Sequence, residues 1–131
     1  MKRDMDLIRQ ILLRLEDMHI GAGEVYSIDW SDPMLQFEGH TMDAMVYNLE
    51  QIEMSGFINC PSGAKGMTAL GYAGLTPRGH EFLDEIRSPK VWQLTKEGMQ
   101  KAGVFSLEIV GQIARHYVRE IASKTLGFDI S

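Results

Sequence analysis

The chain of 131 residues has one cysteine, Cys60, and no long apolar run. One cysteine cannot form an internal disulfide, and no Cys or His residues stand at zinc-finger spacing, so a secreted disulfide scaffold and a zinc finger are both excluded. No stretch approaches the roughly 18 apolar residues that a membrane span needs. The N-terminus is charged where a signal peptide would be apolar. We therefore expect a soluble cytoplasmic protein.

Lysine and arginine are absent from residues 15–64, which we call the acidic segment. This segment holds nine of the 18 Asp and Glu residues, and it accounts for the formal net charge of −5 because the flanking residues 1–14 and 65–131 are each slightly basic. The remaining composition, 44% hydrophobic and 24% charged residues, is typical of one ordinary globular domain. We expect a single domain over residues 1–131.

A strand that runs directly into a helix is predicted for residues 70–87. Leu70 and Tyr72 have the apolar spacing of a strand, Thr76 is suited to cap a helix, and Pro77 falls at the first helical position, where its missing N–H is harmless. The helix is expected to bury three apolar side chains, Phe82, Leu83 and Ile86, with Phe82 filling the core beneath the hairpin. This corner predicts a packing arrangement and carries no chemistry of its own.

Four further helices are predicted from apolar residues that recur every three or four positions. They run from about Asp4 or Asp6 to Met18, from Thr41 to Gly56, from Ser88 to Ala102, and from Ser106 to about Gly127. Arg9 and Arg14 fall off the apolar stripe of the first helix, so we expect them to face solvent. Residues 25–30 and 34–37 are short apolar runs that indicate a hairpin or two extended segments.

The order of these elements predicts the fold class. Phe57 begins a strand, and the turn residues 61–66 return the chain to the corner at residue 70. Helix, extended piece, helix, hairpin and helix is the order of a winged-helix-like α+β domain, with its core at about residues 4–87 and a C-terminal helical extension at about 88–128. The usual middle helix is missing or fused into the helix after Thr41.

Several motifs together resemble a known family. They are Leu49-x-x-Ile-x-x-Ser-Gly-Phe-Ile, Leu75-Thr-x-x-Gly-His-Glu-Phe-Leu-Asp-x-x-Arg, Trp92 and Leu126-Gly127, together with residues 1–13. Over nearly the whole chain they resemble the bacterial and prophage domain-of-unknown-function family 2513. The resemblance implies a winged-helix-like regulator and supplies no activity, ligand or catalytic residue. Where relatives tend to have Tyr-His, this chain has Tyr47-Asn48, which argues against histidine chemistry at that position.

No residue pattern indicates catalysis. His80, Glu81 and Asp84 form His-Glu-x-x-Asp, which lacks the second histidine of a metalloprotease helix, so a helix-surface pair is favoured over metal ligands. Cys60 has no nucleophile signature and is typical of a small buried hydrophobic residue. Residues 62–66 resemble a phosphate loop only in composition. We expect no enzyme activity, no catalytic residue, no metal, no cofactor and no small-molecule substrate.

Two binding functions remain open, DNA-linked regulation and protein binding. In a winged helix the helix before the hairpin enters the major groove, and here it would present three carboxylates to the phosphates, Asp43, Glu50 and Glu53. DNA contact is therefore expected only from basic residues elsewhere, Lys65, Arg78, Arg115, Arg119 and Lys124. The family architecture favours DNA-linked regulation. The alternative is an adaptor or inhibitor whose acidic face, within residues 15–64 and including Asp43, Glu50 and Glu53, binds a basic protein.

The last predicted helix has an apolar face wider than one small core covers. Ile109 and Ile113 lie off the centre of that face, and in a monomer they would form an exposed apolar ridge. We therefore expect a homodimer joined partly through Ile109, Ile113 and Tyr117.

Overall fold

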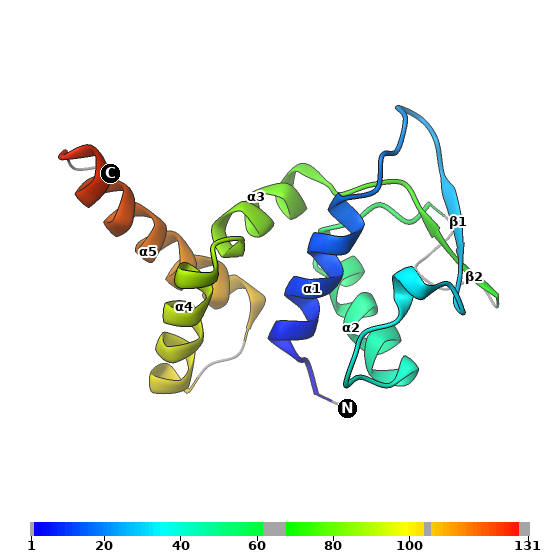
Figure 1. The fold of residues 1–131 in the computed structure, drawn as a ribbon, viewed down its shortest axis with the longest axis horizontal. Coiled ribbons are helices and arrows are strands. Elements are labelled where there is room, and N and C mark those ends of the chain that lie inside the picture. The colour runs from blue at the N-terminus through cyan, green and yellow to red at the C-terminus, as the bar shows by residue number, and fades with distance from the viewer. Residues whose placement is uncertain (1, 62–67, 104–105, 129–131) are drawn as a thin grey trace. The chain divides into compact units, whose positions relative to one another are not determined.

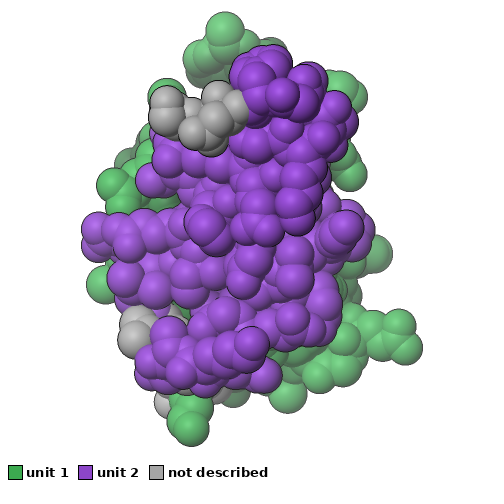
Figure 2. Space-filling view, turned by 90° about the vertical axis from the view of Figure 1, so that its left-hand side faces the viewer, with its two compact units in different colours: residues 1–80 green, residues 81–131 purple. Residues whose placement is uncertain are grey.

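The computed structural model describes residues 2–61, 68–103 and 106–128 (Figure 1). Within these ranges the chain forms five α-helices, one short 3-10 helix and two strands, which is a mostly helical α+β fold. It divides into two compact units, residues 1–80 and residues 81–131, coloured apart in Figure 2. The division falls inside helix α3 (Pro77–Ile86), earlier than the boundary after Arg87 that was predicted from the sequence.

Two capped helices form the base of unit 1, residues 1–80. Helix α1 (Met5–Glu16) begins at Asp4 and helix α2 (Met42–Met54) begins at Thr41, and each capping side chain accepts a hydrogen bond from an amide in the first turn. These bonds satisfy amide groups that have no partner within the helix. Helix α2 is followed by Gly56, whose φ of 78° is the left-handed conformation that glycine adopts most easily. All these boundaries were predicted to within two residues.

The apolar sides of α1 and α2 form the centre of the core of unit 1. The buried side chains are Leu7, Ile8, Ile11, Leu12 and Leu15 of α1 with Met45, Leu49 and Ile52 of α2. Full burial of each such side chain contributes about 1.5 to 3 kcal/mol to stability. One buried polar residue joins the two helices: Asn48, 1% exposed, accepts a hydrogen bond from the Asp4 amide at 2.8 Å and donates to the Ala44 carbonyl at 2.8 Å.

The sheet joins segments from either side of α2 in the sequence. Strand β1 (Tyr26–Asp29) pairs antiparallel with strand β2 (Ala69–Tyr72), with Ile28 opposite Leu70. On the side of β2 away from β1, Ile58 forms an isolated bridge with Leu75. The predicted hairpin between residues 57–60 and the corner strand is therefore only partly right, because the paired strand of β2 is β1. Of the predicted turn at residues 61–66, residues 62–66 lie outside the described residues.

The segment before α2 differs from the prediction. Residues 33–35 form the 3-10 helix η1 (Pro33–Leu35), not an extended strand, because Asp32 caps it and Pro33 fixes the first turn. The prediction that Arg14 faces solvent is also wrong. Its guanidinium lies 3.9 Å from the centre of the Phe37 ring and donates a hydrogen bond to the Met34 carbonyl at 3.0 Å. A charged head and its aliphatic stem thus cover an apolar surface that is distant in sequence.

The corner between β2 and α3 has the predicted form. The Thr76 hydroxyl caps α3 by accepting a hydrogen bond from the Gly79 amide at 3.0 Å, and it donates to the Gly56 carbonyl. The Phe57 carbonyl accepts a hydrogen bond from the Thr76 amide at 3.0 Å. A Cβ atom built on Gly79 would lie 2.0 Å from the Phe57 carbonyl oxygen, so α3 touches this backbone at a distance that only glycine permits.

Two helices predominate in unit 2, residues 81–131. Helices α4 (Pro89–Ala102) and α5 (Leu107–Leu126) were both predicted, and they pack on each other. A Cβ atom on Gly98 would lie 3.1 Å from Cγ2 of Ile113, so the glycine lets α5 approach α4 closely. Ile109 and Ile113 are accordingly half-buried. The predicted exposed ridge is wrong at Ile113, because this side chain packs over Gly98 of the same chain, and Ile109 is also only partly exposed.

The end of α3 lies in unit 2. Phe82 is buried as predicted, with 6% exposure. A Cβ atom on Gly111 of α5 would lie 3.6 Å from the ring carbon Cδ1 of Phe82, so α5 packs against this ring. Its place beneath the hairpin, which belongs to unit 1, stays a prediction. No helix in the described part of the chain combines the length and the apolar character that crossing a bilayer requires.

Candidate functional site

The basic residues predicted to contact nucleic acid are distributed over both units. Arg78 belongs to unit 1, whereas Arg115, Arg119 and Lys124 belong to α5 in unit 2. Lys65 lies outside the described residues. Of the four that are described, three therefore share one helix of unit 2, and Arg78 lies on α3 in unit 1.

Carboxylates offset part of the positive charge on α5. The Arg115 Nε atom lies 2.9 Å from Oε1 of Glu85, and the Lys124 Nζ atom lies 3.5 Å from Oε1 of Glu120. Such exposed pairs contribute only about 0 to 1 kcal/mol to stability. They nevertheless reduce the charge that these cations can offer to a phosphate.

Helix α2 presents carboxylates and no cation. Its sequence holds Asp43, Glu50 and Glu53 and has no lysine or arginine. Asp43 and Glu50 lie seven residues, about two turns, apart and so share one side of the helix. Asp43 is exposed, and Glu50 and Glu53 are half-buried. The helix that enters the major groove in a winged helix therefore carries charge of the wrong sign for that role in this chain, as the sequence predicted.

Strand β1 lies at the edge of the sheet, within the acidic segment. In the described part of the chain its paired strand is β2 alone. Two apolar side chains at its start are exposed, Val25 by 54% and Tyr26 by 42%. Glu24 and Asp29 flank them, and both are exposed. Sequence reasoning predicted an extended run here but missed the edge, because each pairing partner lies at least 40 residues away in the sequence.

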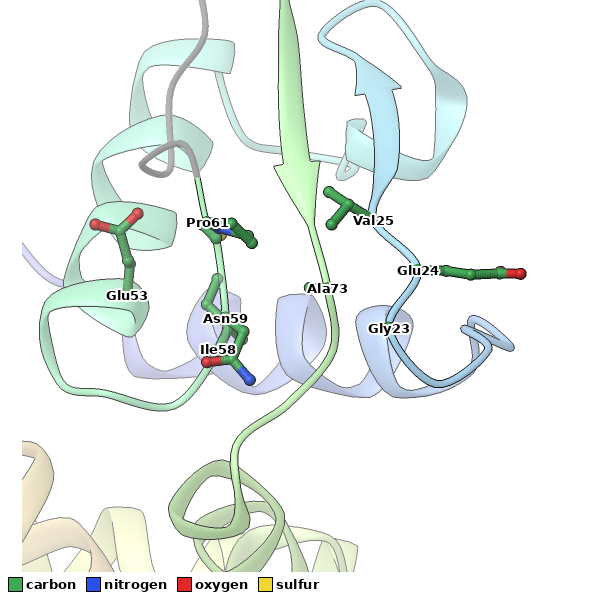
Figure 3. Close-up of a pocket in the computed structure, with 9 residues that line it drawn as sticks. Gly23, Glu24, Val25, Glu53, Ile58, Asn59, Pro61 and Ala73 are labelled. Atoms are coloured by element: carbon green, nitrogen blue, oxygen red, sulfur yellow. The ribbon is translucent and has the colours of Figure 1, made fainter.

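An open hollow of about 530 Å³ lies where β1 begins and β2 ends. It is lined by residues 23–25, 58–61, Glu53 and Ala73. In Figure 3, Val25 and Pro61 lie on either side of the segment directly after β2 that carries Ala73, and Glu24 extends away from them. The Oε2 atom of Glu53 is buried, and it has no hydrogen-bond partner among the described residues.

The cysteine in this hollow is unsuited to nucleophilic chemistry. Cys60 is half-buried. Burial, and after it the charge of Glu53, raises the pKa of the Cys60 thiol to about 11. Only the thiolate is a strong nucleophile, so at neutral pH this side chain is a protonated and unreactive thiol.

The residues of the His-Glu-x-x-Asp pattern point to different partners. The Nδ1 atom of His80 lies 3.9 Å from Oε2 of Glu16, and Asp84 accepts a hydrogen bond from Arg87 at 2.9 Å. Across residues 2–61, 68–103 and 106–128, no three His, Cys, Asp or Glu side chains are grouped as metal ligands would be. The described residues thus offer no site on which metal chemistry can be argued.

Comparison with known proteins gives a family without a described activity. A family model described as "Hypothetical protein (DUF2513)" matches residues 2–105, which ends before α5. An uncharacterised protein of Haemophilus influenzae is 29% identical over 124 residues, which cover 92% of this chain and 98% of that protein. No solved structure matches the chain.

Proposed function

We propose, from the premise that the chain belongs to the DUF2513 family, that it is a non-catalytic regulatory protein that binds a basic protein partner through its acidic segment. The family carries no described activity, so the proposal depends on the residues. The observation that carries it is the charge of residues 15–64, with nine carboxylates and no lysine or arginine.

The exposure of these carboxylates supports the proposal. Six of the nine lie at exposed positions, namely Asp17, Glu24, Asp29, Asp32, Glu38 and Asp43. A surface with charge of one sign attracts a partner of the opposite sign and raises the rate of encounter. Exposed apolar side chains at Val25 and Tyr26 lie between two of these carboxylates. An apolar centre with a charged rim is typical of protein interfaces.

DNA-linked regulation is the second candidate, because the order of the elements supports a winged-helix-like domain. Strand β1 follows α1, pairs with β2 across the sequence of α2, and leaves residues 57–59 on the other side of β2. Arg78 and Arg119 are exposed and are two of the five basic residues that this function would use. The carboxylates of α2 weigh against it, and so we place it second.

A paired titration tests the two functions. Fluorescence anisotropy is measured with a labelled duplex of random sequence and with a labelled ten-residue peptide of alternating lysine and valine, each at 50 and 200 mM NaCl. The proposal expects the peptide to bind and to weaken with salt, and the duplex to show no binding. Binding of the duplex with a steep loss at higher salt, and no binding of the peptide, would favour the DNA-linked function.

Two variants locate the binding surface. Glu24→Gln with Asp29→Asn removes charge from either end of β1 and should weaken peptide binding about two- to fivefold for each carboxylate that faces the peptide, since an exposed charge pair contributes up to about 1 kcal/mol. Glu108→Gln with Glu120→Gln removes the same charge from α5 in unit 2. This control should leave the affinity unchanged, and an equal loss in both variants would mean that net charge alone attracts the peptide.

A further inference from the structure

We propose that β1 is a docking edge, to which an extended lysine- or arginine-bearing segment of the partner protein adds as a further strand. The inference depends on the proposed function, because it states how the acidic segment holds its basic partner. Peptides that add to a sheet edge gain affinity from main-chain hydrogen bonds and specificity from alternate side chains.

The hydrogen-bond pattern shows which backbone groups are available. The Trp30 amide donates to the Thr68 carbonyl at 3.2 Å, which continues the ladder between β1 and β2. In an antiparallel ladder the backbone N–H and C=O groups of successive residues point alternately to the two sides of the strand. The groups of Tyr26 and Ile28 therefore bond to β2, while the amides of Ser27 and Asp29 face the opposite side. The Asp29 carbonyl already accepts a hydrogen bond from Asp32.

The position of the strand leaves that side accessible. In Figure 3 residues 57–61, β2 and β1 follow one another across the sheet, and β1 is the outermost. Among the described residues no strand pairs with its outer side. The Ser27 amide and carbonyl and the Asp29 amide are therefore the groups that an added strand would meet.

The side chains around the edge select a cationic occupant. Glu24 and Asp29 stand at the two ends of the strand, and both are exposed. The Asp29 carboxylate accepts hydrogen bonds from the Ser31 amide and hydroxyl at 2.8 and 2.6 Å, which lowers its pKa and keeps it ionised at neutral pH. Opposite charges on neighbouring strands attract, and Val25 offers apolar contact between them.

The same charges argue against a second copy of this chain as the occupant. Antiparallel pairing of β1 with another β1 would place acidic residues of both copies at one short junction, and like charges across strands repel. The strand is also only four residues long. Proteins commonly use short, charged edge strands to prevent pairing between identical edges. A lysine-bearing strand from another protein is not repelled, because its charge is opposite to that of the acidic edge.

A substitution on the free edge tests the docking mode. Ser27→Pro removes the outward amide but no bond to β2, and proline is tolerated on edge strands where the N–H faces solvent. Ser27→Ala is the matched control, since it removes the hydroxyl and keeps the amide. The probe is the alternating lysine and valine peptide, with a second version that carries N-methyl groups on the amides of one edge. This version keeps the charge and cannot complete the ladder.

The outcomes separate the inference from the proposed function. Ser27→Pro and peptide N-methylation should each weaken binding about tenfold or more, and Ser27→Ala should bind like the wild type. Equal binding of both peptides to the wild type would overturn the docking edge and leave the acidic binding function standing. No binding of the unmethylated peptide would overturn both. Should Ser27→Pro not fold, as judged by circular dichroism, the two peptides on the wild type decide the question.

Discussion

At the scale of single residues, Gly79 is the glycine that least tolerates an added side chain. A Cβ atom there would lie 2.0 Å from the Phe57 carbonyl oxygen, well inside contact distance, and the obstacle is backbone that cannot rotate away. Gly79→Ala should therefore lower the free energy of unfolding by about 3 kcal/mol or more. Urea denaturation monitored by circular dichroism measures this change.

A second alanine in the same helix provides the control. Glu81 is exposed on α3, so Glu81→Ala should change stability by less than about 0.5 kcal/mol. Alanine in a helix is ordinarily favoured over glycine by about 1 kcal/mol. A neutral or stabilising effect of Gly79→Ala would mean that α3 does not approach Phe57 as closely as described.

Cys60 gives a prediction for pH. Its pKa of about 11 lies above the ordinary value of 9.0, so the folded state holds the proton more tightly than the unfolded state. The stabilisation is complete below about pH 9 and is lost as the pH rises towards 11. Iodoacetamide should accordingly modify the folded protein at pH 8 much more slowly than a short unfolded peptide that contains cysteine.

The contribution of Cys60 is isolated by Cys60→Ala. Burial also raises the pKa of Tyr72, so the wild type alone does not separate the two groups. Between pH 9 and 11, thermal melting of Cys60→Ala should show a smaller loss of stability than the wild type. Rapid alkylation at pH 8 with the fold intact would contradict the raised pKa.

At the scale of elements, one side chain joins the starts of α1 and α2. Asn48 is buried and accepts a hydrogen bond from the Asp4 amide. Asn48→Ala leaves that amide without its partner and should lower the free energy of unfolding by about 1 to 3 kcal/mol. Met54→Ala, at a side chain of the same helix that is 78% exposed, should change it by less than about 0.5 kcal/mol. Similar losses in both variants would contradict this role.

The five helices were predictable because their signals are local. A capping residue such as Thr41 or Ser106 lies next to the amides that it satisfies, and the apolar spacing follows directly. The partner of β1 was not predictable, because the pairing depends on how α2 and the segments around it fold between the two strands. The prediction that Arg14 faces solvent was wrong for the same reason, since the Met34 carbonyl that accepts its hydrogen bond is 20 residues away in the sequence. The acidic segment could be recognised from the composition of residues 15–64. The outer edge of β1 within it could be recognised only from the strand order of the folded chain.

At the scale of the whole molecule, homodimer formation through α5 stays a prediction. Its interface is better placed beyond Ile113, because α5 has 20 residues and its neighbour α4 has 14. Leu126 and Phe128 are 57% and 61% exposed near the end of α5. Light scattering should give twice the chain mass, and Leu126→Glu with Phe128→Glu should give a folded monomer.

The matched variant is Ile113→Glu, which places a charge against Gly98 of the same chain at a half-buried position. It should lower stability by about 2 kcal/mol or more, whatever the oligomeric state. A monomeric wild type would rule out the dimer. A dimer that survives Leu126→Glu with Phe128→Glu would mean that another surface joins the copies.

The pairing of β1 with β2 across α2 has a consequence during synthesis on the ribosome. Roughly 40 residues separate the two strands, so at ordinary rates of translation β1 emerges about 2 to 8 seconds before its partner exists. During that interval both of its edges are unpaired, and other nascent chains from the same messenger lie nearby. The carboxylates at Glu24 and Asp29 then act as a safeguard on the unfinished chain, since they repel the identical strand of a neighbouring copy until β2 arrives.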